Sequence, residues 1–335
     1  MKMKWIAAVV SVTMTGAALA QNINAAGATF PEPIYQKWFS EYAQQHPNVK
    51  INYQPIGSGG GIRQVSDGTV DFGASDAIMT DDQMSSAKVK VMMLPTVLGA
   101  VVPIYNIPGV NKPINFSGDV IADIYLGKIT HWNDARIMKD NPGVSLPDQQ
   151  ILPVYRSDGS GTTFIFTDYL SKVSPEWASR VGKNSSVKWP AGVGAVKSEG
   201  VAGMVRQAKG AFGYVELIYA LQNHIEYGAV KNAAGKFLQG TPAGVTAAAA
   251  AAAKTIPADY RVSITNAPGA DSYPISSFTW LLIPKQFADP AKGQAVKGFL
   301  EWMLDHGQSE CAGLFYAPLP AQVVTMERKT IQTVK

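Results

Sequence analysis

Three short turns of this chain share glycine and hydroxyl residues, and each directly precedes a stretch that can form a helix. The turns are residues 26–31 (AGATFP), 57–61 (GSGGG) and 157–163 (SDGSGTT). The start of a helix leaves backbone N–H groups unpaired and carries about half a positive charge. Glycine lets a ligand approach such a backbone closely. Three such turns in one chain predict a site that holds a small oxyanion through uncharged donors.

Each turn supplies hydroxyl and backbone N–H donors for such a site. The candidate donors are Thr29 and Phe30 in the first turn, Ser58 in the second, and Ser160, Gly161 and Thr162 in the third. The alternative for any single turn is plain N-capping, because Ser, Thr and Gly are favoured at helix starts in any case. The recurrence of the pattern favours the binding site.

A basic and an acidic residue flank the third turn. Arg156 lies two residues before Asp158. A guanidinium can bind an oxyanion through two donors, and we expect Asp158 to hold it in place from behind. The alternative is an ordinary surface ion pair, which contributes about 0–1 kcal/mol. The glycine and hydroxyl residues around the pair favour a functional arginine.

Asp76, in the string FGASDA, does not fit a simple anion site. A carboxylate repels an anion unless the anion carries a proton, and the carboxylate then accepts a hydrogen bond from it. Phosphate keeps a proton near neutral pH, as the second pKa of about 6 of a phosphoester implies. Sulfate is only an acceptor there. Asp76 therefore predicts a site that selects a protonated oxyanion, with a turn or N-cap aspartate as the alternative.

The N-terminus predicts export from the cytoplasm. Two lysines precede a short apolar stretch that ends in Ala18-Leu19-Ala20, a small-x-small cleavage pattern, so residues 1–20 are expected to be a signal peptide cleaved near Ala20. Removing Lys2 and Lys4 lowers the formal charge from +4 to +2, and this near-neutral balance gives no support for a nucleic-acid partner. We therefore expect an exported protein.

The remaining reactive residues predict neither an enzyme nor a cofactor. The only cysteine, Cys311, has apolar neighbours and is expected to be buried and structural. The four histidines lack metal-ligand spacing, so no metal site is predicted. The turns lack the lysine of a nucleotide-binding loop, the G-x-G-x-x-G fingerprint and the G-x-S-x-G nucleophile motif.

Strand-like and helix-like segments alternate along the chain, which indicates an α/β architecture. Strands are expected at 23–26, 49–53, 71–75 and 89–94, with a helix opened by Pro31 and a short helix after Gly61. Two longer apolar segments, 98–105 and 273–283, are expected to be buried strands, and Phe299 to Met303 a buried helical stripe. Residues 239–253, with seven consecutive alanines, predict a solvated helix or spacer.

Four strings carry a resemblance to the PstS family, the phosphate-binding proteins of Pst-type ABC importers. They are residues 26–31 (AGATFP), 57–62 (GSGGGI), 71–77 (DFGASDA) and 156–163 (RSDGSGTT), and the strings 212–216 (FGYVE) and 273–275 (YPI) also fit. The resemblance runs in the same order from about residue 23 to the C-terminus. Residues 239–253 are where we expect the largest departure from the family.

The resemblance implies an α/β protein with the two-lobed periplasmic-binding-protein fold (Venus-flytrap, type II). Each lobe would be a mixed sheet flanked by helices, and two crossing strands near 101–104 and 275–278 would form the hinge. Residues 21–101 with 276–335 would make lobe I, and 102–275 lobe II. It further implies phosphate contacts from Thr29, Phe30, Ser58 and Asp76 in lobe I and from Arg156, Ser160, Gly161 and Thr162 in lobe II.

The function implied is a non-enzymatic receptor that captures inorganic phosphate in the cleft and passes it to the membrane permease and ATPase of an ABC importer. One alternative keeps the fold and changes the anion. Asp76 disfavours sulfate and molybdate, whereas arsenate is protonated like phosphate and stays open. A second alternative is an exported phosphatase with Ser160 or Ser58 as nucleophile, which would need a base or metal that the sequence does not indicate.

Overall fold

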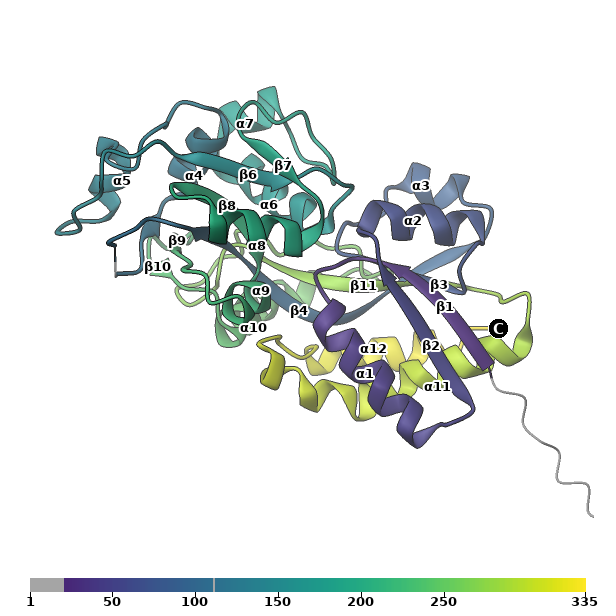
Figure 1. The fold of residues 1–335 in the computed structure, drawn as a ribbon. Coiled ribbons are helices and arrows are strands. Elements are labelled where there is room, and N and C mark those ends of the chain that lie inside the picture. The colour runs from purple at the N-terminus through teal and green to yellow at the C-terminus, as the bar shows by residue number, and fades with distance from the viewer. Residues whose placement is uncertain (1–20, 111) are drawn as a thin grey trace, which may run out of the picture.

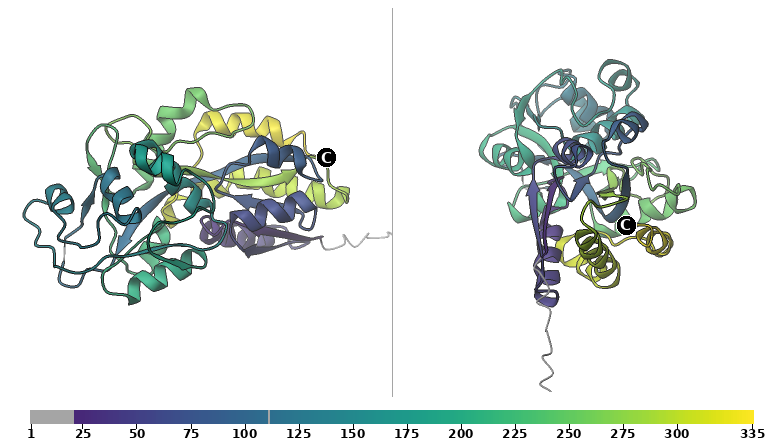
Figure 2. Two further views of the ribbon diagram at one scale, coloured as in Figure 1. Left: turned by 90° about the horizontal axis from the view of Figure 1, so that it is seen from above. Right: turned by 90° about the vertical axis from the view of Figure 1, so that its right-hand side faces the viewer.

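The protein is a mixed α/β molecule with two lobes. The structure is a computed structural model that describes residues 21–110 and 112–335; the predicted signal peptide lies outside these residues. One lobe contains strands β1, β2, β3 and β11 with helices α1, α2, α3, α11 and α12, and the other contains strands β6, β7 and β8 with helices α4 to α9 (Figure 1). The molecule is elongated along the line that joins the lobes (Figure 2).

The elements of the first lobe, in chain order, are as follows. They are β1 (Gln21–Gly27), α1 (Glu32–Gln45), β2 (Val49–Pro55), α2 (Ser58–Asp67), β3 (Phe72–Ser75), α3 (Asp81–Ser86), the long strand β4 (Val91–Tyr105), β11 (Ser276–Pro284), α11 (Pro290–Asp305), the 3-10 turns η2 (Gly307–Glu310) and η3 (Ala312–Leu314), and α12 (Ala321–Ile331). The strands and helices expected before residue 89 are confirmed, except that α2 ends at Asp67 before the left-handed Gly68.

The intervening chain forms the second lobe and a small separate sheet. Its elements are β5 (Asn115–Phe116), α4 (Gly118–Tyr125), α5 (Ala135–Asp140), β6 (Leu152–Arg156), α6 (Gly161–Val173), α7 (Pro175–Arg180), β7 (Val193–Ala195), α8 (Lys197–Gln207), β8 (Ala211–Glu216), α9 (Leu217–Gln222), β9 (Ala229–Lys231), β10 (Phe237–Leu238), α10 (Pro242–Ala252) and η1 (Ala253–Thr255). Strands β10, β9 and β5 pair with one another.

The strands of both lobes join into one continuous sheet in the order β2-β1-β3-β11-β4-β8-β6-β7. The pairs among β1, β2 and β3 and among β6, β7 and β8 are parallel, whereas β11 and β4 run antiparallel to their neighbours. Each lobe therefore holds a mixed sheet, as expected. Helices α1 and α11 cover one face of the first-lobe strands, and α2 covers the other (Figure 1).

A single strand, β4, connects the two halves of the sheet. Its residues 91–100 pair with β11, and Val101 to Tyr105 pair with β8. The chain returns beside it, where the Val101 amide donates to the Ile275 carbonyl at 2.9 Å. Two crossing segments thus lie at the expected positions.

The expected strands at 89–94 and 98–105 are one strand of 15 residues, because a bulge accommodates the residues between them. Val97 pairs with Thr279 and Pro95 with Trp280, so Thr96 is the extra residue. A bulge tolerates a proline that cannot donate to the ladder.

The alanine-rich segment is a helix, but it is not a solvated spacer. Helix α10 packs on β4 and β11, and Gly244, Val245, Ala248 and Ala249 are buried. Small side chains allow the helix to lie close to the strands. The stripe of α11 around Phe299 is buried as predicted.

Cys311 is fully buried, and burial raises the pKa of its thiol to about 12, as expected for a structural cysteine.

Within residues 21–110 and 112–335, none of the helices has both the length and the apolar character that crossing a bilayer would require.

One core residue lowers the stability of the fold. Glu327 on α12 is fully buried, and neither of its carboxylate oxygens has a hydrogen-bond partner among the described residues. Burial raises the pKa of this carboxyl well above its ordinary value. The charged form is therefore penalised in the folded state.

We predict that Glu327→Met raises the free energy of unfolding by about 1–3 kcal/mol, because it removes an unpaired buried carboxyl. The gain should be larger at pH 8 than at pH 5, since a group with a raised pKa loses stability as the pH rises. Urea unfolding at both pH values measures it, with Glu226→Met at an exposed position as control. A variant less stable than the parent at pH 8 would contradict the assignment.

Candidate functional site

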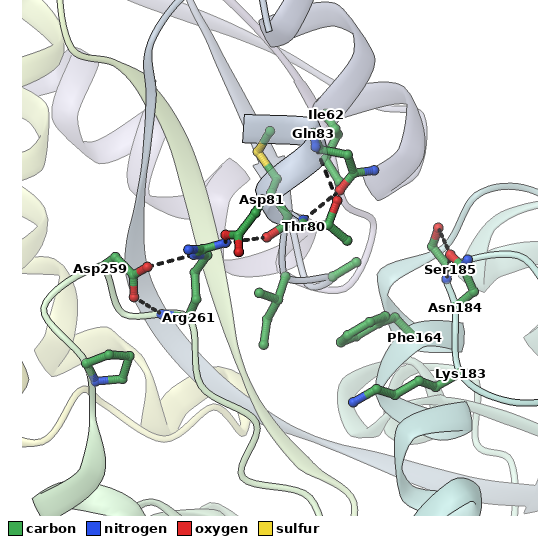
Figure 3. Close-up of a pocket in the computed structure, with 14 residues that line it drawn as sticks. Ile62, Thr80, Asp81, Gln83, Phe164, Lys183, Asn184, Ser185, Asp259 and Arg261 are labelled. Carbon is green, nitrogen blue, oxygen red and sulfur yellow. Dashed lines mark hydrogen bonds and ion pairs between the residues drawn. The ribbon is translucent and has the colours of Figure 1, made fainter. Parts of the chain in front are cut away.

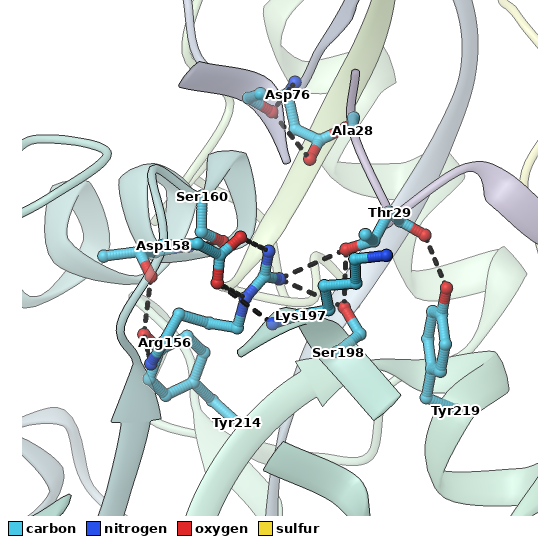
Figure 4. A network of polar contacts seen from close by, with 12 residues as sticks. Ala28, Thr29, Asp76, Arg156, Asp158, Ser160, Lys197, Ser198, Tyr214 and Tyr219 are labelled. Atoms are coloured by element: carbon cyan, nitrogen blue, oxygen red, sulfur yellow. Dashed lines mark hydrogen bonds and ion pairs between the residues drawn. The ribbon is translucent and has the colours of Figure 1, made fainter. Parts of the chain in front are cut away.

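The three glycine turns of the sequence meet between the lobes. The amide of Gly59, at the start of α2, donates to the carbonyl of Gly159 at 2.9 Å. The hydroxyl of Thr29 lies 2.9 Å from that of Ser198 on α8, across the lobe interface (Figure 4). Segments that are 100 or more positions apart thus form one site, which we call the cleft site.

The first turn lies between β1 and α1 and is buried. The Thr29 hydroxyl accepts a hydrogen bond from Nη1 of Arg156 at 3.2 Å, and its carbonyl accepts from the Tyr219 hydroxyl at 2.6 Å. Phe30 is fully buried, and its carbonyl accepts from the Tyr316 hydroxyl at 2.7 Å. The hydroxyls of Tyr219 and Tyr316 thus bind the backbone carbonyls of the turn and hold it in place.

Ser58 and Asp76 form the next part of the first-lobe half. Ser58 starts α2, and Asp76 follows β3. The amide of Asp76 donates to Oγ of Ser58 at 3.1 Å, and Oγ lies 3.4 Å from Oδ2 of Asp76. Burial raises the pKa of Asp76 to about 7, against the opposing effects of a hydrogen bond from Thr279 and the charge of Arg156. Asp76 is 1% exposed, so its carboxyl faces protein and not solvent.

Arg156 and Asp158 form a bidentate ion pair. Nε donates to Oδ1 at 2.8 Å and Nη2 to Oδ2 at 2.5 Å. The Arg156 side chain is 2% exposed, so this is not a surface ion pair. Although burial acts to raise it, the hydrogen bonds from Arg156 hold the pKa of Asp158 below its ordinary value. The pairing leaves Nη1 directed at Thr29 and Ser198 (Figure 4).

The third turn begins α6, and its hydroxyls differ in their partners. Oγ of Ser160 accepts from the amide of Thr163 at 3.1 Å, so Ser160 is an N-cap whose own proton stays available to donate. The hydroxyl of Thr162 is buried and has no partner among the described residues. A buried hydroxyl without a partner is costly, so it points to a group that the protein receives from outside.

Gly161 lies where only glycine fits. A Cβ at this position would lie 2.4 Å from Oγ of Ser58 and 2.5 Å from Oδ2 of Asp76. The glycine therefore brings the amides that start α6 directly onto the first-lobe half of the site. The structure thus brings together the residues that the sequence singled out.

Sequence reasoning missed four residues of the site: Lys197, Ser198, Tyr219 and Thr279. The hydroxyl of Ser198 accepts from Nη1 of Arg156 at 3.2 Å. The Lys197 amide donates to Oδ1 of Asp158 at 3.0 Å from a left-handed backbone with φ of 62°. Ser198 places a hydroxyl in the first turn of α8, which is a weaker form of the hydroxyl-at-helix-start pattern of the three turns. Thr279 lies within a strand and has no local signal.

A groove of about 890 Å³ adjoins the cleft site between the lobes (Figure 3). Ile62 of α2 and Phe164 of α6 line it, one turn beyond the residues of the cleft site. Its cations are paired, since Arg261 contacts Asp81 and Asp259, and Lys183 contacts Asp168. Among the described residues, no group of three or more His, Cys, Asp or Glu side chains could hold a metal ion.

Comparison with known proteins agrees with this geometry. A family model described as a PBP superfamily domain matches residues 12–306. The phosphate-binding protein PstS of Xylella fastidiosa (strain Temecula1) is 45% identical over 90% of this chain and 82% of its own length. That of Pasteurella multocida (strain Pm70) is 44% identical over 91% and 88%. The chain belongs to the PstS family of the PBP superfamily.

Solved structures show the same fold at lower identity. A phosphate-binding protein from Stenotrophomonas maltophilia is 19% identical, with a TM-score of 0.71 over 92% of this PstS-family chain and 94% of that one. A high-affinity periplasmic phosphate-binding protein, solved with phosphate bound, is 21% identical with a TM-score of 0.72 over 92% and 93%. The two-lobed fold is confirmed by these similarities.

A carboxyl pair of this PstS-family chain lies at the rim of the cleft site. Glu32 in the first turn of α1 and Glu199 in the first turn of α8 flank the Thr29–Ser198 contact. Burial, followed by the nearby Glu199 carboxyl, raises the pKa of Glu32 to about 7, and the charge of Lys197 opposes the shift. The folded protein therefore binds a proton here that an unfolded chain releases at lower pH.

We predict that Glu32→Gln changes the pH dependence of stability. A raised carboxyl pKa gives stability that is complete below about 4.5 and is lost as the pH rises to about 7. The melting temperature of the variant relative to the parent should therefore rise between pH 5 and pH 7 and then level off. Thermal unfolding at pH 5, 6, 7 and 8 measures this, with Glu226→Gln as control. A difference in melting temperature that stays constant across these pH values would contradict the raised pKa of Glu32.

Proposed function

We propose that this protein is a periplasmic receptor that binds inorganic phosphate in the cleft site and delivers it to the permease and ATPase of an ABC importer. The names of its relatives and the geometry of the site support the proposal. The proposal also includes export by a signal peptide in residues 1–20, action as a monomer, and the absence of catalysis.

The buried Thr162 hydroxyl is the observation that carries the proposal. It has no partner among the described residues and lies beside the amides that start α6. Arg156, held by Asp158, and the hydroxyls of Thr29, Ser58 and Ser160 supply further donors around the same point. We assign phosphate contacts to Thr29, Phe30, Ser58, Asp76, Arg156, Ser160, Gly161 and Thr162.

Asp76 gives the site its preference among oxyanions. The carboxylate can accept a hydrogen bond from an anion that carries a proton, and it repels one that does not. Phosphate retains a proton near neutral pH, whereas sulfate does not. A site that depends on a ligand hydrogen rejects an analogue lacking it by a large factor. Arsenate is protonated like phosphate and stays an alternative cargo.

The geometry supports binding better than phosphatase catalysis. Oγ of Ser58 pairs with Asp76, and Oγ of Ser160 accepts from the Thr163 amide. Neither contact gives the serine a histidine or lysine base, which a serine nucleophile needs. The donors are arranged to hold an oxyanion that does not react.

Closure of the lobes would bring the two halves of the site together around the ion. Glycine is required where the lobes touch, because a Cβ on Gly161 would clash with Ser58 and Asp76. We propose residues 21–101 with 276–335 as lobe I and 102–275 as lobe II, because β4 changes its pairing partner at Val101. Arg261, inside the second range, also contacts Asp81 and the Met79 carbonyl of the first lobe. Each lobe would carry half of the phosphate contacts, so an ion bridging them favours the closed form.

Titration calorimetry tests the proposed cargo. We predict that the purified protein, freed of bound anion by unfolding and refolding, binds phosphate at least about 10⁴-fold more tightly than sulfate. Both anions are measured at pH 7.5 and equal ionic strength. Comparable affinities would reject the proposed role of Asp76, and no binding of phosphate would reject the function.

Arginine replacement tests the site. We predict that Arg156→Ala weakens phosphate binding by about 1.5–3 kcal/mol, because it removes charge-assisted hydrogen bonds from a buried guanidinium. Arg180→Ala, at an exposed arginine of α7, is the matched control and should bind as the parent does. Unchanged affinity in Arg156→Ala would remove this residue from the site.

A further inference from the structure

A row of buried hydroxyl groups lies behind Asp76, on the side away from the cleft. Oγ1 of Thr279 on β11 donates to Oδ1 of Asp76 at 2.7 Å. The Tyr35 hydroxyl of α1 lies 2.7 Å from Oγ1 of Thr96 on β4, which donates to the Thr279 carbonyl at 3.3 Å. All four side chains are at most 1% exposed. Three elements of the first lobe, α1, β4 and β11, therefore meet behind one carboxyl group.

The strand register places Thr279 opposite Asp76. Ser75 pairs with Trp280 in the antiparallel β3–β11 ladder, so the next residues, Asp76 and Thr279, face each other. The bulge of β4 also falls here, since Thr96 is the residue left without a strand partner. Bulges re-aim side chains beside functional sites. Here the bulge directs Thr96 toward Tyr35 and Thr279.

Which group donates in each of these hydrogen bonds depends on which group carries a proton. An ionised Asp76 has no proton, so the single hydroxyl proton of Thr279 must point at Oδ1. The proton of Thr96 is used on the Thr279 carbonyl, so the Tyr35 hydroxyl is the donor in its bond with Thr96. With Asp76 ionised, the Thr279 hydroxyl therefore donates to it, and the Tyr35 and Thr96 hydroxyls hold the Thr279 backbone in place.

The other carboxylate oxygen faces the cleft site. Oδ2 lies 3.4 Å from Oγ of Ser58 and would lie 2.5 Å from a Cβ on Gly161. With Oδ1 occupied by Thr279, Oδ2 is the oxygen through which Asp76 can meet a ligand. Burial favours the protonated carboxyl, and the Thr279 hydrogen bond is the largest effect that opposes it.

We propose that Thr279 is a specificity-determining positioning residue, whose hydroxyl keeps Asp76 a hydrogen-bond acceptor so that the bound anion must supply the proton. The inference rests on the proposed function, because it needs Asp76 to face the cargo. Thr279 itself does not touch the anion. Without its hydroxyl, the buried carboxyl takes up a proton more readily and becomes a donor. A donor at this position weakens binding of protonated phosphate and favours sulfate.

The test compares Thr279→Val, which removes the hydroxyl, with Thr279→Ser, which keeps it. Calorimetry with inorganic phosphate and with sulfate is carried out at pH 6 and pH 8. We expect the valine variant to bind phosphate about 10–100-fold more weakly, the range for a hydrogen bond to a charged group. Its preference for phosphate over sulfate should fall as well, and more at pH 6 than at pH 8. The serine variant should keep the parent's preference within about threefold.

A purely structural role would change stability without changing the preference between anions. Melting temperatures of all variants are therefore measured, and Thr279→Ala replaces the valine variant if that variant fails to fold. A preference equal to the parent's in the folded valine or alanine variant overturns the inference while leaving the phosphate receptor intact. A parent protein that does not prefer phosphate over sulfate overturns the proposed selectivity and, with it, this inference.

Discussion

The burial of charged groups between the lobes is the constraint on which the rest of the structure depends. Asp76 and Arg156 are almost fully buried and the Asp158 side chain is 16% exposed, and a buried charge left unpaired costs several kcal/mol. The ion pair satisfies Arg156 and Asp158, and the Lys197 amide adds a further donor. Asp76 relies instead on neutral hydroxyl groups. The arrangement places the donors of three turns and a single carboxyl acceptor in one site.

A single guanidinium among uncharged donors suits the proposed receptor, which must release its cargo. A cluster of cations would bind any anion with little discrimination, whereas fixed hydroxyl and amide dipoles bind by position. The donors come from two lobes joined through β4 and the segment before β11. Separation of the lobes would therefore divide the set and weaken its hold on the ion. The division of fixed donors between two lobes would thus account for both selectivity and release.

Sequence reasoning singled out residues that the structure brings together, because their signals are local. Glycine and hydroxyl residues before a helix mark a donor-rich turn wherever the chain goes afterwards, and Arg156 and Asp158 lie two positions apart. The alanine-rich segment was predicted to be a solvated helix or spacer; it is a helix, but one face is buried, which could not be predicted because that face depends on the strands beneath it. Two expected strands proved to be the single strand β4, because a bulge opposite Thr279 carries Pro95 and Thr96 within the ladder. Thr279 could not be found, because its partner lies about 200 positions away.

By itself, the sequence determined the α/β class, the donor turns and the buried cysteine, since each depends on neighbours within a few positions. Only the tertiary structure decided that one sheet runs through both lobes, that Ser198 and Lys197 complete the surroundings of Arg156, and that a threonine of β11 lies behind Asp76. Strand order and register bring distant residues together, and one step in register turns a side chain to the opposite face of the sheet.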